Sequence, residues 1–191
     1  MILYMLDMEW FEKSGYCEAG QKSKKHHQAG QFLLQYALGK ESYQQAEFTV
    51  GEHGKPYIRN SSIHYNISHS GSYVVLVTGT TELGVDIQEK KSARLEAMAK
   101  RFFAKEEWQA FADCNTIEEQ RDLFYHIWCR KEAYGKYLGV GLNEAVLHTN
   151  VLEKVEGCSF MEYDGPEGYQ ISICCGKEEE IEEVISVFEG L

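Results

Sequence analysis

The chain has 191 residues, of which 43% are hydrophobic and 13% aromatic, and it contains two prolines. This length and composition suffice for one large domain or two small packed ones with a hydrophobic core, and they exclude a disordered chain. The formal net charge of −11 disfavours general binding to nucleic acid, whose phosphate backbone attracts basic surfaces.

Targeting signals are not evident in the sequence. The start shows no basic stretch followed by an apolar one, and no long apolar run occurs elsewhere, so we expect neither secretion nor a membrane span, and a cytoplasmic location. The six cysteines include no CxxC pair, which disfavours a zinc site, and a disulfide scaffold would be smaller and richer in cysteine. We therefore expect reduced, buried thiols.

The first part of the chain alternates one helix with several strands. MILYML predicts a short buried strand, and apolar residues at helical spacing predict a helix over 23–38, with Gly39 as its stop. GEHGKPYI reads as a loop leading into a short strand. It is followed by the strand-turn segment IHYNISHSG, the apolar strand SYVVLVTG and, after a turn, LGVDIQ.

The second part is richer in helix. Apolar spacing predicts helical structure over 93–111 and a second long helix over 118–138, and YQISICC predicts a strand. The tail is ambiguous, because Ile181, Val184, Ile185 and Phe188 fit a helix whereas VISVF has the composition of a strand.

This order of elements predicts an α+β fold. Each half offers helix material followed by strands, which suits two similar halves related by a pseudo-twofold axis, 1–83 and 84–191, with the active site in the cleft between them. No sequence identity between the halves supports this division, so it depends on the pattern alone.

The segment GVDIQ places polar side chains inside an apolar strand. Alternate side chains share one face of a strand, so Asp86 and Gln88 point to the same side, opposite Val85 and Ile87. Either that face meets solvent, or it supplies oxygen ligands.

The segment FYHIWCRKEAYGKYL supplies a second acidic position on a helix with an apolar stripe. Glu132 lies one turn beyond Trp128, and Lys136 lies one turn beyond Glu132; Lys131 lies at the other edge of the stripe. Alone, Glu132 and Lys136 read as a helix-surface pair that contributes about 0.2–0.5 kcal/mol.

Taken with the strand, the helix favours a different interpretation. Two carboxylates and an amide, from Asp86, Glu132 and Gln88, form an oxygen cluster of the kind that magnesium accepts together with water and substrate phosphate. The two lysines nearby are suited to phosphate oxygens.

These residues carry a resemblance to a known family. GVDIQ, followed 46 residues after Asp86 by Glu132 of WCRKEAYGK, resembles the paired signature motifs of phosphopantetheinyl transferases. AKRFFAKEEW, NISHSG, GKP and KKHHQAGQFLLQYAL resemble further family segments in the right order, and together they cover most of residues 22–142. The length is similar to that of the surfactin-type subgroup, which implies a two-halved monomer.

The resemblance implies a magnesium-dependent transfer of the 4′-phosphopantetheine arm of coenzyme A to a serine of an apo acyl or peptidyl carrier protein, with release of adenosine 3′,5′-bisphosphate. Asp86, Gln88 and Glu132 would form the metal site. Glu132 would also be the general base, directly or through a water, and Lys131 and Lys136 would neutralise the transferring phosphoryl group.

Coenzyme contacts are implied in the first half. Ser68 and His69 of NISHSG would meet a phosphate. The adenosine phosphates would be held by Lys24, Lys25, His26 and Lys55. Without the resemblance, His69 reads as a structural histidine, Lys55 as a turn lysine and the early basic run as a solvated helix face.

A second basic cluster, Lys100, Arg101 and Lys105, is a candidate surface for an acidic carrier protein, because an acidic enzyme must attract such a partner through local cations. Phe102 and Phe103 lie between these cations. Core packing is the competing explanation for both aromatic residues.

Two departures from the family pattern leave alternatives open. Gln88 replaces a carboxylate, which lowers the expected metal affinity unless coenzyme phosphate compensates, and His26 stands where arginine is common. The alternatives are a magnesium-dependent coenzyme or nucleotide pyrophosphatase, and a coenzyme A- or carrier-binding protein with impaired catalysis.

Overall fold

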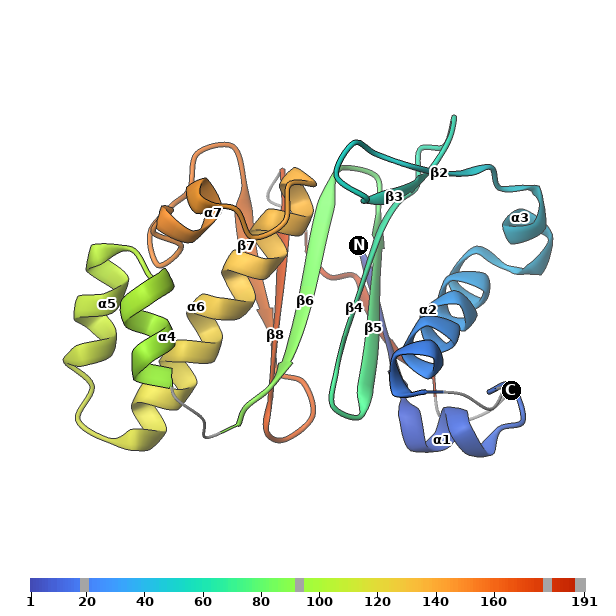
Figure 1. Cartoon of the computed structure of the whole chain (residues 1–191). Coiled ribbons are helices and arrows are strands. Elements are labelled where there is room, and N and C mark those ends of the chain that lie inside the picture. The colour runs from blue at the N-terminus through green and yellow to red at the C-terminus, as the bar shows by residue number, and fades with distance from the viewer. Residues whose placement is uncertain (18–20, 92–94, 177–179, 188–191) are drawn as a thin grey trace.

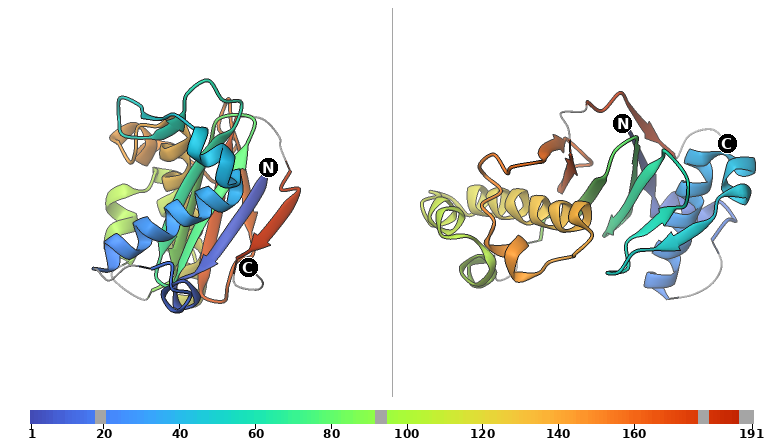
Figure 2. Two further views of the ribbon diagram at one scale, coloured as in Figure 1. Left: turned by 90° about the vertical axis from the view of Figure 1, so that its right-hand side faces the viewer. Right: turned by 90° about the horizontal axis from the view of Figure 1, so that it is seen from above.

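The computed structural model describes residues 1–17, 21–91, 95–176 and 180–187. Two β-sheets pack face to face through an apolar core, and helices cover the outer face of each sheet (Figures 1 and 2). This mixture of helices and mainly antiparallel sheets confirms the predicted α+β class. No helix in the described ranges has the length and apolar character needed to cross a membrane.

The first sheet has the strand order β4-β5-β1-β9. Its strands are β1 (Ile2–Asp7), β4 (His64–Ser70), β5 (Tyr73–Gly79) and β9 (Glu183–Ser186). Three helices belong to this part of the chain: α1 (Met8–Lys13), α2 (Lys22–Leu38) and α3 (Lys40–Gln45). The predicted stop of α2 is confirmed, since Gly39 follows it with a φ of 75°, a conformation that glycine adopts without steric cost.

The second sheet has the order β6-β8-β7, and all its pairs are antiparallel. Its strands are β6 (Leu83–Glu89), β7 (Ser159–Tyr163) and β8 (Tyr169–Cys175). The helices here are α4 (Leu95–Phe102), α5 (Lys105–Ala112), α6 (Ile117–Leu138) and α7 (Glu144–His148). A small separate sheet pairs β2 (Phe48–Val50) with β3 (Pro56–Ile58).

Strand alternation decides which side chains face the helices. In β6, Val85 and Ile87 are fully buried between the two sheets, so Asp86 and Gln88 point to the opposite side, towards α6. Gly84 lies on that same side, and a Cβ atom there would lie 2.2 Å from the carbonyl oxygen of Ala133. Only glycine permits this close contact between β6 and α6.

Two sequence expectations are refined by the structure. The predicted helical stretch 93–111 is broken between α4 and α5, where the backbone N–H of Ala104 donates to the Glu107 carboxylate and begins a new helix. The ambiguous tail forms strand β9, which pairs in parallel with β1. Phe188, which belonged to the helical alternative, lies outside the described residues.

Because β9 joins the first sheet, hydrogen bonding does not divide the chain at residue 84. The strands of 1–83 form most of the first sheet, and the segment 84–191 contributes its last strand to that sheet. The division into 1–83 and 84–191, with the active site in the cleft between the two halves, stays a prediction.

Candidate active site

Asp86 lies at the centre of a polar cluster where β6, β4 and α6 meet, and it is 2% exposed. Its Oδ1 accepts hydrogen bonds from Ser68 Oγ at 2.7 Å and Lys136 Nζ at 2.6 Å. Its Oδ2 accepts from Gln88 Nε2 at 2.9 Å and from the Cys129 thiol at 3.4 Å. Four side-chain donors therefore hold this carboxylate, and one of them is a cation.

Side chains of β4 connect the two sheets at this point. Three backbone N–H groups of β6 donate to side-chain oxygens of β4: Val85 to Asn66, Ile87 to Ser68 and Glu89 to Ser70. Each pair is separated by 19 residues, so the two strands run in parallel. These side-chain oxygens take the place of the carbonyl groups with which a neighbouring strand would pair the N–H groups of β6. The same alignment brings Ser68 to Asp86.

Glu132, one turn after Cys129 on α6, faces the same cluster. Burial and the charge of Asp86 raise the pKa of Glu132 to about 7, and Lys136 opposes this shift. Within the described ranges, the carboxylate of Glu132 accepts no hydrogen bond, in contrast to Asp86. Its negative charge therefore lacks a compensating donor, which suits an incoming cation.

The donors of this cluster fit magnesium only in part. No group of three or more histidine, cysteine or acidic side chains capable of holding a metal occurs among the residues the structure describes. Asp86 and Glu132 provide two carboxylates, and magnesium is commonly held by one or two carboxylates completed by water and substrate phosphates. The site therefore fits magnesium provided that a phosphate ligand is present.

Lys131 lies away from this cluster. Its ammonium group is fully buried, 2.7 Å from the equally buried Glu107 carboxylate. It also donates to the carbonyl oxygens of Leu147 and Thr149 at 2.8 and 2.7 Å. Because these acceptors hold it on another side of α6, the structure contradicts the expectation that Lys131 neutralises the phosphoryl group.

His69 and His26 form a stacked pair beside the cluster, with ring centroids 4.5 Å apart. Burial lowers the pKa of His69, and the nearby His26 and Lys136 lower it further. Burial also lowers the pKa of His26, which lies 3.2 Å from the carbonyl oxygen of Gly71. Both rings are therefore neutral at pH 7. A neutral imidazole carries one N–H, and the N–H of His26 is donated to the Gly71 carbonyl.

The early basic run lines a cavity next to this histidine pair. The cavity measures about 710 Å³ and includes His26, Lys22 and Lys25 in its lining. Lys25 forms an ion pair with Glu12, and Lys24 is exposed in the first turn of α2. His26 and Lys25 thus share this cavity.

Lys55 is held by three acceptors: Glu82 Oε2 at 2.7 Å, the Leu83 carbonyl at 3.0 Å and the Tyr137 carbonyl at 3.2 Å. The Tyr137 carbonyl lies in the last turn of α6, where the helix dipole favours a cation. Lys55 therefore ties the loop before β3 to the end of α6. A cavity of about 210 Å³ adjoins it and is also lined by Asn66 and Lys136.

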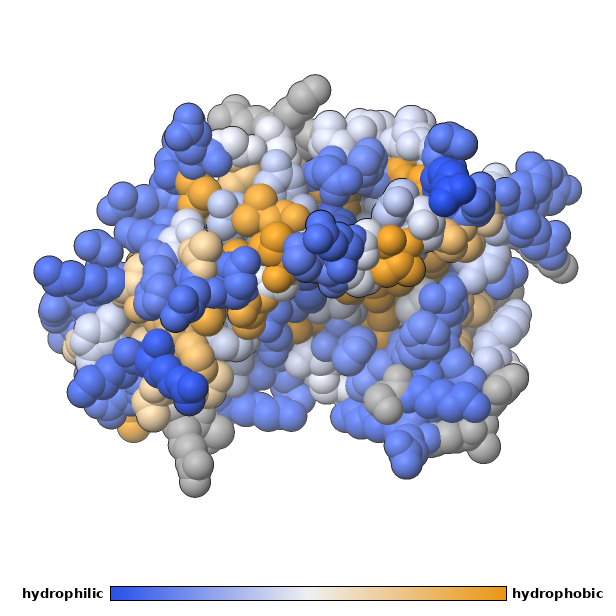
Figure 3. Space-filling view, turned by 45° about the horizontal axis from the view of Figure 1, so that its top comes forward, coloured by the Kyte–Doolittle hydropathy of each residue, from blue (hydrophilic) through white to orange (hydrophobic). Residues whose placement is uncertain are grey.

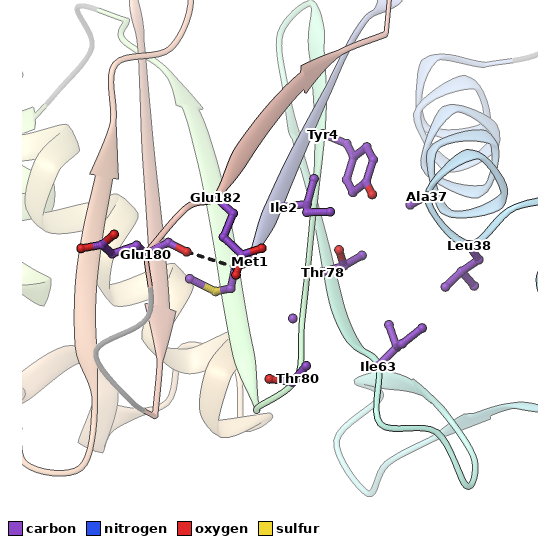
Figure 4. Close-up of a pocket in the computed structure, with 11 residues that line it drawn as sticks. Met1, Ile2, Tyr4, Ala37, Leu38, Ile63, Thr78, Thr80, Glu180 and Glu182 are labelled. Atoms are coloured by element: carbon purple, nitrogen blue, oxygen red, sulfur yellow. Dashed lines mark hydrogen bonds and ion pairs between the residues drawn. The ribbon is translucent and has the colours of Figure 1, made fainter.

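Another hollow, of about 560 Å³, lies between the end of α2 and the strands β1 and β5 of the first sheet (Figure 4). Tyr4, Leu38, Ile63 and Thr78 contribute to its lining, together with Glu180 and Glu182. None of the side chains that contact Asp86 lines it. It is therefore distinct from the candidate active site.

Two contributors to the site were not predicted. Cys129 lies three residues before Glu132, so helical spacing already placed it on a nearby face. Asn66 lies two residues before Ser68, so strand alternation placed it on the same face. The periodicity therefore placed both residues near the site. Their roles were not predicted because the sequence does not show which groups the Cys129 thiol and the Asn66 amide contact.

Comparison with known proteins reveals clear relatives. A family model described as the 4′-phosphopantetheinyl transferase superfamily matches residues 82–179, just over half of the chain. The 4′-phosphopantetheinyl transferase Sfp of Bacillus subtilis (strain 168) is 32% identical over 166 residues, which cover 80% of this chain and 72% of that protein. A 4′-phosphopantetheinyl transferase of Bacillus subtilis is 34% identical over 140 residues, which cover 66% of this chain and 62% of the relative's length.

Proposed function

The chain belongs to the 4′-phosphopantetheinyl transferase superfamily, a class of transferase enzymes, and we propose that it transfers the 4′-phosphopantetheine arm of coenzyme A to a serine of an apo acyl or peptidyl carrier protein. The observation that carries this proposal is the meeting of Asp86, Glu132 and Lys136 in one cluster, 2.6 Å separating the Lys136 ammonium from Asp86. Two carboxylates and a lysine are the groups that a diphosphate reaction requires.

In this proposal, Asp86 and Glu132 hold magnesium. When bound, the cation supplies charge neutralisation for the diphosphate. Lys136 lies on the same side of α6 and can pass from Asp86 to a phosphoryl oxygen, where a lysine acts as a point charge. We keep Lys131 outside the catalytic set because Glu107 pairs with it in the interior.

The coenzyme phosphates would be held mainly by the first half of the chain. Ser68 already contacts Lys136 at 2.8 Å, and the neutral rings of His69 and His26 lie beside it; His26 would donate to a phosphate only by releasing the Gly71 carbonyl. Lys24 and Lys25 are proposed for the adenosine phosphates, through the cavity that Lys25 lines. Lys55 would contribute only by exchanging one of its three present acceptors for a phosphate oxygen.

The reaction forms a bond between the carrier serine oxygen and the β-phosphorus of coenzyme A, and it breaks the bond from that phosphorus to the bridging oxygen. Adenosine 3′,5′-bisphosphate leaves. The serine proton passes to Glu132 or to a water that Glu132 orients. A carboxylate that holds magnesium is a weak base, so the route through the water is favoured.

The candidate carrier surface lies on α4 and α5. Lys100, Arg101 and Lys105 are exposed, which suits an acidic partner. The two aromatic residues differ: Phe103 is 6% exposed and belongs to the core. Phe102 is half-buried beneath the Arg101 guanidinium, whose carbon lies 4.9 Å from the ring centroid. Figure 3 shows the molecule from the front and above, where hydrophilic residues surround separate apolar patches.

Intact-protein mass spectrometry of apo-carriers exposed to the protein, coenzyme A and magnesium tests this function. We expect the carrier to gain the mass of the phosphopantetheine arm, and we expect Asp86→Ala and Glu132→Ala to abolish that gain while the fold is retained. Glu118→Ala, which removes an exposed glutamate from the first turn of the same helix, is the matched control. Near-normal transfer by either active-site variant would contradict the assignment.

The alternatives give different products. Release of nucleotide from coenzyme A without any carrier would identify a pyrophosphatase. Activity that emerges only in Gln88→Glu would identify a binding protein whose catalysis is impaired by the amide.

A further inference from the structure

We propose that Gln88 positions Asp86 as a hydrogen-bond donor instead of ligating metal, so that the protein captures its divalent cation only together with the coenzyme diphosphate. This inference rests on the proposed function, because it takes coenzyme A as the ligand of the same site. It concerns the order and the coupling of binding, which the family assignment leaves undefined.

The first step is the direction of the Gln88 amide. Its Nε2 atom lies 2.9 Å from Oδ2 of Asp86. A carboxylate oxygen only accepts hydrogen bonds, so the amide must present its N–H and not its carbonyl oxygen to this atom. The carbonyl oxygen of the amide is therefore not the atom that contacts Asp86. In the resting site, Gln88 therefore orients Asp86.

The second step is the occupation of the other oxygen of Asp86. Ser68 Oγ and Lys136 Nζ both donate to Oδ1. Lys136 also donates to the carbonyl oxygen of Val85 at 3.0 Å and to Ser68 at 2.8 Å, so three acceptors hold its ammonium. A cation that approaches Asp86 alone must compete with this ammonium group for the same carboxylate.

The third step is charge. The ionised Asp86, Glu132 and Lys136 sum to a single negative charge, whereas a carboxylate at position 88 would make it two. Magnesium dehydrates reluctantly and usually combines one or two carboxylates with phosphate oxygens. The protein alone therefore offers a weak site, and a diphosphate supplies both the missing oxygens and the missing charge.

The diphosphate also provides a new partner for Lys136. If Lys136 moves from Asp86 to a phosphoryl oxygen, Asp86 becomes available to the metal at the same moment. Coenzyme and cation then favour each other's binding, and linkage requires the two enhancement factors to be equal.

Binding measurements with Mn²⁺ as the probe, by titration calorimetry and by the electron paramagnetic resonance of the free ion, test this coupling without turnover. The cation is titrated into the protein alone and into the protein saturated with coenzyme A, with carrier absent and with the chelation by free coenzyme subtracted. We expect coenzyme A to tighten Mn²⁺ binding by at least tenfold, and Mn²⁺ to tighten coenzyme binding by the same factor. Equal Mn²⁺ affinity with and without coenzyme would overturn the proposal.

Two substitutions at position 88 distinguish a side chain that donates to Asp86 from one that ligates the metal. Gln88→Glu adds a charge, so its affinity for Mn²⁺ without coenzyme should rise at least tenfold and its coupling factor should fall. Gln88→Met keeps the length of the side chain but removes the amide. Because Ser68 and Cys129 still donate to Asp86, loss of a donor alone should leave the affinity for Mn²⁺ with coenzyme present within threefold of the parent protein. A tenfold loss in Gln88→Met would show that the amide is a ligand and would refute the inference.

These outcomes are distinguishable from failure of the proposed function. Transfer to a carrier without metal–coenzyme coupling would contradict this inference alone. Coupling with the expected Gln88 pattern, but with no mass gain on any carrier, would contradict the transferase proposal alone. The parent-protein titrations require no substitution, so they remain decisive even if a variant folds poorly.

Discussion

Glu132 should lower the stability of the protein in the absence of metal, and replacing it with glutamine should raise that stability. The carboxylate is largely buried beside Asp86, and within the described structure it accepts no hydrogen bond, so the nearby Lys136 offsets its charge only in part. Glu132→Gln keeps the size of the side chain and removes its ionisation. We therefore expect a variant that is inactive in transfer and more stable than the parent protein.

The pKa of Glu132 determines the magnitude and the direction of this effect. Burial raises the pKa from 4.5 to about 7, which corresponds to about 3 kcal/mol at about 1.4 kcal/mol for each pKa unit. Well below pH 4.5 Glu132 is protonated in both the folded and the unfolded chain, so its ionisation costs no stability. As the pH rises towards 7 the unfolded chain ionises first, so the free energy of unfolding falls through this window and the loss is complete above it.

Urea denaturation at several pH values, with a chelator present to remove metal, measures this effect. Glu132→Gln should exceed the parent protein by about 3 kcal/mol near pH 8 and by about 1 kcal/mol or less at pH 5. Glu118→Gln, on the exposed first turn of α6, should follow the parent at each pH. Parallel curves for Glu132→Gln and the parent would refute the reasoning, because they would show that the folded protein imposes no cost on the ionised carboxylate.

Two further predictions concern the support of the site. Lys131→Met leaves the buried Glu107 without its cation, so we expect the free energy of unfolding, measured by urea denaturation, to fall by about 3–5 kcal/mol. Lys154→Met, at an exposed position, is the control. An equal effect of the two substitutions would contradict a buried ion pair. Gly84→Ala forces a Cβ to within 2.2 Å of backbone in α6, so we expect a loss of about 3 kcal/mol in the same assay. Gly51→Ala, where a Cβ meets only ordinary contacts, should stay close to the parent, and similar stability of both glycine variants would show that β6 and α6 do not pack as closely as described.

Much of the site follows from local periodicity. Alternation along GVDIQ places Asp86 and Gln88 opposite Val85 and Ile87, and the helical spacing of WCRKEAYGK places Glu132 and Lys136 one turn apart. The two-residue and 3.6-residue repeats are properties of the backbone, so a sequence reveals which side chains share a face. The order of the motifs then indicated the family, and the family model and relatives confirm it.

Partners across the fold were decided only by tertiary structure. Lys131 and Lys136 both carry an ammonium on the same helix, yet one meets Glu107 in the interior and the other meets Asp86. The tail had the composition of either a helix or a strand, and pairing with β1 selected the strand. Periodicity defines the face on which a side chain lies, but what stands opposite that face depends on segments distant in sequence, and those contacts form only when the sheets and helices pack.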